Sequence, residues 1–379
     1  MNIVYIASNI DYLHVPFIEE LISSIGMGKL SYYVQDRVIE ERAKLGFKLY
    51  NLSWIYDIGT NNKNFDDALN NADVIICSVR NFYTQMECCL KKGKIVFYFS
   101  ERWFKDGWGK YRLLYPKLIH IYLKFRKLSM YPNFYYLAQG YYAYEDFKYL
   151  RLCNSRIFNW GYWTDINEHK DICGLSLPVD KINILWCGRM LKWKKVDVLI
   201  KAYIELTRDY DNIHLCVLGR GNEERYLRNL LQTSLPANSY TIKSSLPMTQ
   251  VRSLMNQADI YVLPSNGYEG WGAVVNEAMA EKCVVIGGDR CGAVKTMIHD
   301  GVNGFSFDSS NVGQLIDILK TVIDDRKLMK QVAAQGQSDI IHFWSPAVAA
   351  ERFLNIVKAI IEGKDIRIYK NGILKVYDE

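Results

Sequence analysis

Two carboxylates flank a glycine-rich turn in residues 266–292, which read NGYEGWGAVVNEAMAEKCVVIGGDRCG. The residues concerned are Glu269, Gly270, Trp271, Gly272 and Glu277. Glycines let backbone amides approach a ligand closely, and we predict that a helix begins at about Gly272 or Ala273. The free N–H groups and positive dipole end of such a helix favour a pyrophosphate. The carboxylates would accept hydrogen bonds from sugar hydroxyls, so the pattern predicts a nucleotide-sugar site.

Basic residues follow two apolar, strand-like runs earlier in the chain, INILWC at 182–187 and IHLCVL at 213–218. Behind the first run are Gly188, Arg189 and Lys194, and behind the second are Gly219 and Arg220. Open α/β sheets bind ligands at the carboxyl ends of their parallel strands, so we expect these residues to contact a diphosphate. The alternative is a solvated surface for the cations, and a tight turn for the Gly-Arg-Gly sequence.

Together these residues resemble the retaining glycosyltransferases of the GT-B fold, family four, whose hallmark is E-x7-E. Glu269 and Glu277 have that spacing. The family's phosphate-binding stretch is matched by Gly188, Arg189, Met190, Lys194 and Asp197. Three further matches are LGRGNEERYL at 218–227, SSLPMTQVRSLMNQADIYVLPS at 244–265 and IHDGVNGFSF at 298–307. The resemblance is dense over residues 182–308 and weak in the first half of the chain.

The resemblance implies an α/β chain of GT-B architecture, with two Rossmann-like, doubly wound parallel-sheet domains facing a cleft. It implies transfer of a sugar from a nucleoside-diphosphate sugar, UDP in preference to GDP, to an acceptor hydroxyl with retention of configuration. Glu277 would take the ribose hydroxyls and Glu269 those of the donor sugar. Arg189, Lys194 and the amides at 270–272 would stabilise charge on the leaving diphosphate. No Asp-x-Asp metal motif accompanies these residues, so neither a metal nor another cofactor is expected.

The N-terminal half is expected to bind the acceptor, and it departs from the family at two points. The first loop, SNIDYLH, lacks the family's glycines, and its candidate acceptor ligands are Asp11 and His14. After the run KIVFYF, many family members carry a histidine, which is missing here, and Glu101 is the candidate catalytic substitute. A structural salt bridge from Glu101 to Arg102 or Lys105 is the alternative.

Strand-like runs alternate with helical segments along the chain, as in parallel sheets that are buried on both faces. Predicted strands are 2–7, 73–78, 94–99, 134–138, 156–159, 182–187, 213–218, 240–243, 259–263 and 283–287. The polar stretch 164–181 predicts a domain boundary. The predicted domains are 1–165, 182–344 and 345–379, the last a helix capped by Ser345 that crosses back towards the N-terminal domain, plus a type I′ hairpin at Asn371-Gly372.

The composition, with 49% hydrophobic and 23% charged residues among 379, is that of a globular chain. The nine cysteines have no paired CxxC spacing, so we interpret them as free thiols and expect a reducing, cytoplasmic environment. The N-terminus has no signal-peptide pattern, and no stretch approaches the roughly 20 apolar residues of a transmembrane helix. The net charge of +6 favours anionic partners.

Residues 102–131 hold eight Lys or Arg against one Asp, interleaved with aromatic and aliphatic residues. Such a segment can lie on an anionic membrane surface, and the alternative is a helix with a solvated basic face. We expect peripheral contact with the inner face of the plasma membrane, a glycan or lipid-linked acceptor, and a role in surface-polysaccharide synthesis. No nucleic-acid-binding module accompanies the charge, so no nucleic-acid partner is expected.

Other functions on the same architecture stay open. The nearest alternative is a sugar-nucleotide epimerase, and a non-catalytic nucleotide-sugar-binding protein would use the same donor residues. A glycogen-type phosphorylase needs a Schiff-base lysine, for which the chain offers no clear candidate. A dinucleotide oxidoreductase needs G-x-G-x-x-G after the first strand, where this chain reads ASNIDYLH.

Overall fold

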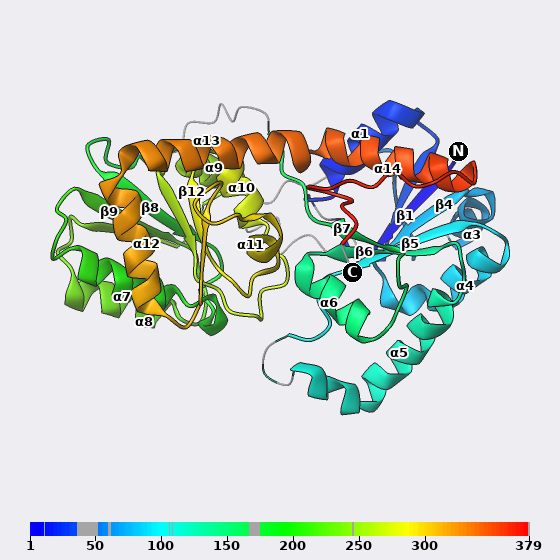
Figure 1. The fold of residues 1–379 in the computed structure, drawn as a ribbon, viewed down its shortest axis with the longest axis horizontal. Coiled ribbons are helices and arrows are strands. Elements are labelled where there is room, and N and C mark those ends of the chain that lie inside the picture. The colour runs from blue at the N-terminus through cyan, green and yellow to red at the C-terminus, as the bar shows by residue number, and fades with distance from the viewer. Residues whose placement is uncertain are drawn as a thin grey trace. The chain divides into compact units, whose positions relative to one another are not determined.

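The computed structural model describes the chain except for residues 11, 36–51, 60–61, 106, 108, 167–174, 245 and 378–379. The chain divides into two compact units, each built on one parallel sheet (Figure 1). The N-terminal unit comprises the described residues of 1–165 together with 343–379, and the C-terminal unit comprises those of 166–342. Asp11, a predicted acceptor ligand, lies outside the described residues.

The N-terminal unit has a seven-stranded sheet in the order β3-β2-β1-β4-β5-β6-β7. Its strands are β1 Ile3–Ala7, β2 Leu30–Val34, β3 Ile55–Asp57, β4 Val74–Cys77, β5 Ile95–Ser100, β6 Phe134–Gln139 and β7 Ile157–Trp160. All neighbouring strands run parallel. The strand order reverses between β1 and β4, and open α/β sheets bind ligands at such a switch point.

Helices cover both faces of this sheet, because alternate strand residues point to opposite sides. The helices of the unit are α1 Val15–Ile25, α3 Asn62–Asn71, η1 Arg80–Phe82, α4 Tyr83–Lys91, η2 Gly109–Leu114, α5 Pro116–Ser129, α6 Tyr141–Tyr149 and α14 Pro346–Ile361. Tyr98 of β5 joins the core that contains Phe125 of α5 and Phe147 of α6. Its neighbour Phe97 packs instead on Phe353 of α14, with ring centroids 4.9 Å apart. Figure 1 shows α14 beside α1 on this second face.

The C-terminal unit has a six-stranded parallel sheet in the order β10-β9-β8-β11-β12-β13. Its strands are β8 Ile182–Cys187, β9 Ile213–Leu218, β10 Tyr240–Lys243, β11 Ile260–Leu263, β12 Val284–Gly288 and β13 Phe305–Phe307. Its helices are η3 Lys192–Lys194, α7 Val196–Leu206, α8 Glu224–Ser234, α9 Met248–Gln257, α10 Val274–Ala280, α11 Gly292–Met297, α12 Val312–Asp324 and α13 Arg326–Phe343. The order reverses between β8 and β11, so the predicted donor residues after β8 and β11 lie at the switch point, and those after β9 follow the neighbouring strand.

All the strands predicted from the sequence are present, and the doubly wound α/β class is confirmed. Three further strands, β2, β3 and β13, were not predicted. The predicted cap of α14 is also confirmed, because the Ser345 side chain accepts a hydrogen bond from the Val348 amide at 3.3 Å.

The predicted hairpin at Asn371-Gly372 is wrong. The segment after α14 makes only isolated bridges among the described residues, and one of these joins Val376 to Phe158 of β7. Its backbone groups are already engaged elsewhere: Arg352 donates to the carbonyls of Asn371 and Ile373, at 2.6 and 2.8 Å. A type I′ turn needs positive φ at both central residues, and of these two only Gly372 has it, at +76°. The amides of Ile373 and Leu374 donate to Phe343 and Asn159 and not to a hairpin partner.

Candidate active site

Three loops at the carboxyl ends of β8, β9 and β11 bring the predicted donor residues together in the C-terminal unit. The β8 and β9 loops are joined by a hydrogen bond from the Met190 amide to the Arg220 carbonyl, at 2.7 Å. The β8 and β11 loops are joined by the Asn266 amide and the Trp193 carbonyl, at 3.1 Å. The carboxyl ends of neighbouring parallel strands lie at one sheet edge, which is why residues far apart in sequence meet here.

The contact between the β8 and β9 loops requires a glycine at position 219. Gly219 has φ of +153°, and a Cβ there would lie 1.8 Å from the Gly188 carbonyl oxygen. Glycine is therefore required by the close contact between the two loops and not by a tight turn, since residues 219 and 220 lie in no turn. This structural role is compatible with donor binding by Gly188 and Arg220.

A buried ion pair joins two of the predicted catalytic residues. The Lys194 ammonium contacts Oε2 of Glu269, and the two side chains are only 13% and 11% exposed. The ammonium also lies 4.6 Å from the centre of the Trp193 ring. Lys194 is therefore not a solvated surface cation, and Glu269 largely compensates its charge.

Arg189 and Arg220 differ from Lys194 in exposure and in ion pairing. Both side chains are exposed, and within the described part of the chain neither forms an ion pair. Their positive charge is therefore available to an anion at the loops after β8 and β9.

The turn at 270–272 leads into α10, which begins at Val274, one or two residues later than predicted. The amides of Gly270 and Gly272 have no acceptor among the described residues. Trp271, however, is fully buried, and its indole donates to the side chain of Asn276 at 2.8 Å. The Trp271 ring therefore belongs to the core, and a contact of Trp271 with the donor would have to come from its backbone amide.

Glu277 lies in the first turn of α10 and is buried, so it is no solvated helix carboxylate. Together with burial, which is the larger effect, its charge raises the pKa of the Cys187 thiol to about 12. Burial likewise raises the pKa of Cys291 to about 12. Both thiols are protonated at neutral pH, as expected for packing residues.

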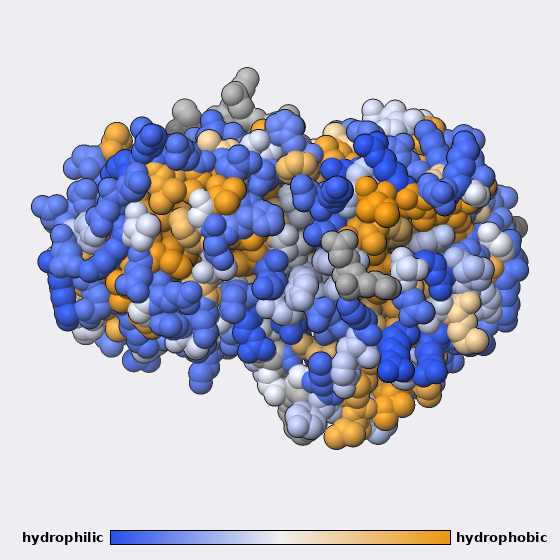
Figure 2. Space-filling model, viewed as in Figure 1, coloured by the Kyte–Doolittle hydropathy of each residue, from blue (hydrophilic) through white to orange (hydrophobic). Residues whose placement is uncertain are grey.

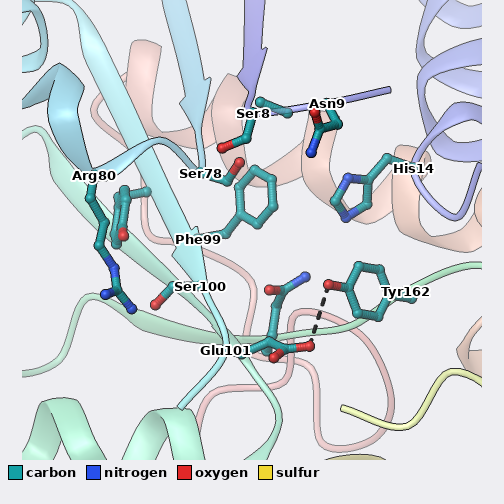
Figure 3. Close-up of a pocket in the computed structure, with 12 residues that line it drawn as sticks. Ser8, Asn9, His14, Ser78, Arg80, Phe99, Ser100, Glu101 and Tyr162 are labelled. Carbon is teal, nitrogen blue, oxygen red and sulfur yellow. Dashed lines mark hydrogen bonds between the residues drawn. The ribbon is translucent and has the colours of Figure 1, made fainter. Parts of the chain in front are cut away.

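A cavity of about 230 Å³ lies at the carboxyl ends of β1, β4, β5 and β6 in the N-terminal unit (Figure 3). Its lining includes two residues that the sequence had singled out, His14 and Glu101. His14 is buried and stacks on Tyr162, with ring centroids 5.1 Å apart. Glu101 accepts a hydrogen bond from the Tyr162 hydroxyl at 3.5 Å.

Both interpretations of Glu101 are compatible with the structure. Its Oε2 lies 3.6 Å from the ammonium of Lys105, so the structural salt bridge is present. The guanidinium of Arg102 lies 4.4 Å from the centre of the Tyr142 ring. Glu101 nevertheless stays partly exposed at the cavity, where a ligand can reach its carboxylate.

A buried carboxylate holds the loop that follows Glu101. Asp146 of α6 accepts hydrogen bonds from the amides of Trp103 and Phe104, at 2.5 and 2.9 Å. Burial raises the pKa of Asp146 to about 6, although the two amides act in the opposite direction.

Sequence reasoning missed several lining residues of this cavity, chiefly Ser78, Gln139 and Tyr162. Ser78 directly follows β4, and Gln139 is the last residue of β6. The rule that ligands bind at the carboxyl ends of parallel strands points to Glu101 after β5, and it applies equally to these two residues.

The basic segment forms η2 and α5. Leu118, Phe125 and Leu128 pack into the unit, as a packed helix requires. A run of large apolar side chains nevertheless stays exposed: Tyr111, Leu114, Tyr115, Ile119, Leu123 and Met130. Figure 2 shows apolar side chains at the surface over this segment. Among the described residues, no helix is both long enough and apolar enough to span a membrane.

The sequence of the C-terminal unit matches a known family. Residues 169–339 match the family model described as "Glycosyl transferases group 1". An uncharacterized glycosyltransferase of Haemophilus influenzae is 30% identical over 171 residues, which are 42% of this chain and 46% of that protein. The UDP-N-acetylglucosamine–peptide N-acetylglucosaminyltransferase GtfA subunit of Streptococcus pneumoniae is 28% identical over 129 residues, 34% of this chain and 25% of that protein. The chain thus spans less than half the length of these curated relatives.

A solved structure extends the likeness to both units. The Anabaena protein HepE, in complex with UDP, matches 95% of this chain and 100% of its own with a TM-score of 0.70 and 14% identity. At that identity the likeness concerns the fold. Residues 169–339 therefore carry the sequence pattern of the group 1 glycosyl transferases, in a chain whose two Rossmann-like parallel-sheet domains have the GT-B type of fold.

Proposed function

We propose that this protein is a retaining glycosyltransferase that moves a sugar from a nucleoside-diphosphate sugar to an acceptor hydroxyl. The observation that carries the proposal is the clustering of cations and carboxylates after β8, β9 and β11. Arg189 and Arg220 are exposed there, and Lys194 is held against Glu269. Cations suit the diphosphate and carboxylates suit sugar hydroxyls, so one edge of the sheet offers partners for both parts of a donor.

In this proposal each group meets a defined part of the donor. Arg189 and Lys194 compensate the charge that develops on the leaving diphosphate, an arrangement that can contribute several kcal/mol. The amides of Gly270 and Gly272 add uncharged donors. Glu269 takes hydroxyls of the transferred sugar.

The ribose of the donor would bind Glu277. Its carboxylate is buried in the first turn of α10, the helix that follows the loop carrying Glu269. Because a buried carboxylate needs hydrogen-bond donors, the two ribose hydroxyls are suitable partners.

The acceptor would bind the cavity of the N-terminal unit, where Glu101 orients the attacking hydroxyl and His14 contributes its ring.

We further propose that no divalent ion is needed, because side chains already supply positive charge to the diphosphate. Activity that stops in excess EDTA and returns with magnesium or manganese would refute this part.

We propose UDP as the nucleotide. The support is that the HepE structure holds UDP and that the Streptococcus pneumoniae relative is named for UDP-N-acetylglucosamine. The experiment is a thermal-shift screen of the full chain against UDP-, GDP- and ADP-sugars. A ligand at 100 times its Kd stabilises a protein by about 2.7 kcal/mol. A chain that no nucleotide sugar stabilises would contradict the proposed function.

Incubation with the stabilising nucleotide sugar separates the enzyme classes. A transferase releases the nucleoside diphosphate when an acceptor is present and preserves the anomeric configuration in its product. An epimerase instead converts the nucleotide sugar without any acceptor. A non-catalytic binding protein leaves it unchanged.

The acceptor is proposed to be a glycan or a lipid-linked glycan used in surface-polysaccharide synthesis, met at the inner face of the plasma membrane. Support comes from η2 and α5, where exposed apolar side chains stand among Lys117, Arg126 and other basic residues. Apolar groups enter the headgroup region while basic groups contact anionic lipids.

A further inference from the structure

The cavity of the N-terminal unit is lined mainly by uncharged polar side chains. They come from the carboxyl ends of four parallel strands: Ser8 after β1, Ser78 after β4, Ser100 of β5 and Gln139 of β6. Figure 3 shows Ser8, Ser78 and His14 around the cavity, with Glu101 and Tyr162 joined at its other side. Hydroxyl and amide groups from separate strands therefore converge on one space.

Gln139 is the most informative of these residues. Its side chain is only 4% exposed, and its Nε2 has no hydrogen-bond partner in the part of the chain that the structure describes. A buried amide donor without a partner costs stability, and an apolar residue of similar shape would avoid that cost. The packing of the protein itself thus gives no reason for a glutamine at this position. A ligand in the cavity would give one, because it could accept a hydrogen bond from the amide.

The lining indicates what that ligand is. An amide both donates and accepts hydrogen bonds, as does a ligand hydroxyl, whereas the Glu101 carboxylate only accepts. The lining also includes one cation, Arg80, which is exposed and lies 5.6 Å from the centre of the Trp103 ring. With one carboxylate and one guanidinium, the lining has no net formal charge, which favours a neutral ligand over an anion.

The size of the cavity and its aromatic rings restrict the class of ligand further. The cavity of about 230 Å³ is smaller than the roughly 300–1,000 Å³ of pockets for drug-sized ligands. Its walls include the aromatic rings of Phe99 and Tyr162, which offer apolar surfaces beside the polar groups. A single sugar ring combines several hydroxyls with apolar C–H faces and suits such a small space.

We propose that this cavity, the Gln139 pocket, binds one neutral sugar ring of the acceptor and that Gln139 determines specificity by hydrogen-bonding a ring hydroxyl. That the bound ring belongs to the acceptor rests on the proposed function, whereas binding of a sugar ring in this cavity does not depend on it. A site whose buried polar groups are satisfied only by the correct hydroxyl strongly rejects a ligand that lacks it, because those groups are then left unpaired.

The test uses the full chain without nucleotide. Binding of the methyl glycosides of glucose, galactose, mannose and N-acetylglucosamine is measured by saturation-transfer NMR and titration, for the wild type and for Gln139→Leu. We expect the wild type to bind at least one of them and the variant to bind it about tenfold more weakly or worse. Deoxy derivatives at positions 2, 3, 4 and 6 are then compared: the one that binds the wild type as weakly as the full glycoside binds Gln139→Leu identifies the hydroxyl that Gln139 contacts.

Stability separates a ligand-binding role from a structural one. Because Gln139→Leu removes an unpaired buried donor, the unliganded variant should unfold at the same temperature as the wild type or about 2–4 °C higher. A lower unfolding temperature would mean that the side chain supports the fold, which overturns the proposal. Gln335→Leu, at an exposed position of α13, is the control and should change neither binding nor specificity.

The remaining outcomes are also decisive. Failure of every methyl glycoside to bind, or tighter binding of glucuronate or inorganic phosphate, overturns the proposal. If Gln139→Leu weakens binding of a UDP-sugar but not of UDP, the pocket holds the donor's sugar and the acceptor assignment fails. If nucleotide sugars do not bind while a methyl glycoside does, the proposed function fails and the sugar pocket stands.

Discussion

At the scale of single residues, the pairing of Lys194 with Glu269 changes what a mutation at this site should do. Lys194, the side chain proposed to bind the diphosphate, is paired with the buried carboxylate of Glu269. Arg189 has the same proposed role but is exposed, without an ion pair in the described part of the chain. The two cations should therefore differ in their contribution to stability.

We predict that Lys194→Ala and Arg189→Ala each lower the transfer rate by about 30- to 1,000-fold, the equivalent of 2–4 kcal/mol. Only Lys194→Ala should also lower the free energy of unfolding, by up to about 3 kcal/mol, because it leaves Glu269 buried and unpaired. Kinetics and denaturant unfolding measure the two effects. The double variant Lys194→Ala, Glu269→Ala should regain stability but not activity. Near-normal turnover in either single variant would contradict the diphosphate assignment.

Asp146 is predicted to make stability depend on pH. Burial raises its pKa in the folded protein to about 6, above the usual 3.8, so the folded state binds a proton more tightly than the unfolded state. The free energy of unfolding should therefore fall as the pH rises from about 4 to about 6, by roughly 1–3 kcal/mol from this group. Denaturant unfolding across that range measures the slope.

The matched variant is Asp146→Asn, whose amide oxygen can still accept from the Trp103 and Phe104 amides. It should remove this part of the pH dependence while leaving the fold intact. A variant with the same slope as the wild type would show that other groups cause it.

At the scale of elements, the glycine that joins the β8 and β9 loops provides a third prediction. Gly219→Ala would place a Cβ against the Gly188 carbonyl, so the two loops must separate. We expect a loss of roughly 2–4 kcal/mol of stability, together with weaker donor binding. Gly28→Ala is the control, since Gly28 also has positive φ, at +90°, but a Cβ at that position would meet no atom within 4 Å. Equal effects of the two substitutions would contradict the loop-contact argument.

Strands of continuous apolar sequence could be predicted, because both faces of a parallel sheet are buried. IVFYFS in β5 and INILWC in β8 show this pattern clearly. The missed strands β3 and β13 have three residues each and lie at sheet edges, so they carry little apolar signal. β2, with the sequence LSYYV, contains a serine and two tyrosines among its five residues.

The part of the candidate site that lies directly after the carboxyl ends of the strands could be predicted from the sequence. Arg189, Lys194 and Glu101 were identified because each comes shortly after an apolar strand. Whether a side chain points into a cavity or into the core depends on packing across the sheet, which spacing does not reveal. Spacing identified the 270–272 turn, but it did not reveal that the ring of Trp271, between the two glycines, fills the core.

At the scale of the whole molecule, positive charge and apolar surface meet on η2 and α5. Leu114 is 76% exposed and Leu123 56%, which is unusual for side chains of a packed helix. Part of the basic charge is already compensated, since Lys127 lies 2.8 Å from Glu87. The groups available to a membrane are therefore the remaining cations together with the exposed apolar side chains.

We predict that the protein sediments with anionic vesicles, not with neutral ones, and that salt releases it as screening grows. Each engaged Lys or Arg should contribute about 1 kcal/mol, so Lys117→Ser with Arg126→Ser should weaken sedimentation by about tenfold or more. Lys327→Ser with Lys330→Ser removes the same charge from exposed positions of α13 and should have little effect. Leu114→Ser with Leu123→Ser tests the apolar contribution, which salt does not screen. If the wild type ignores anionic vesicles at low salt, this surface is a solvated helix face and the lipid-linked acceptor is excluded.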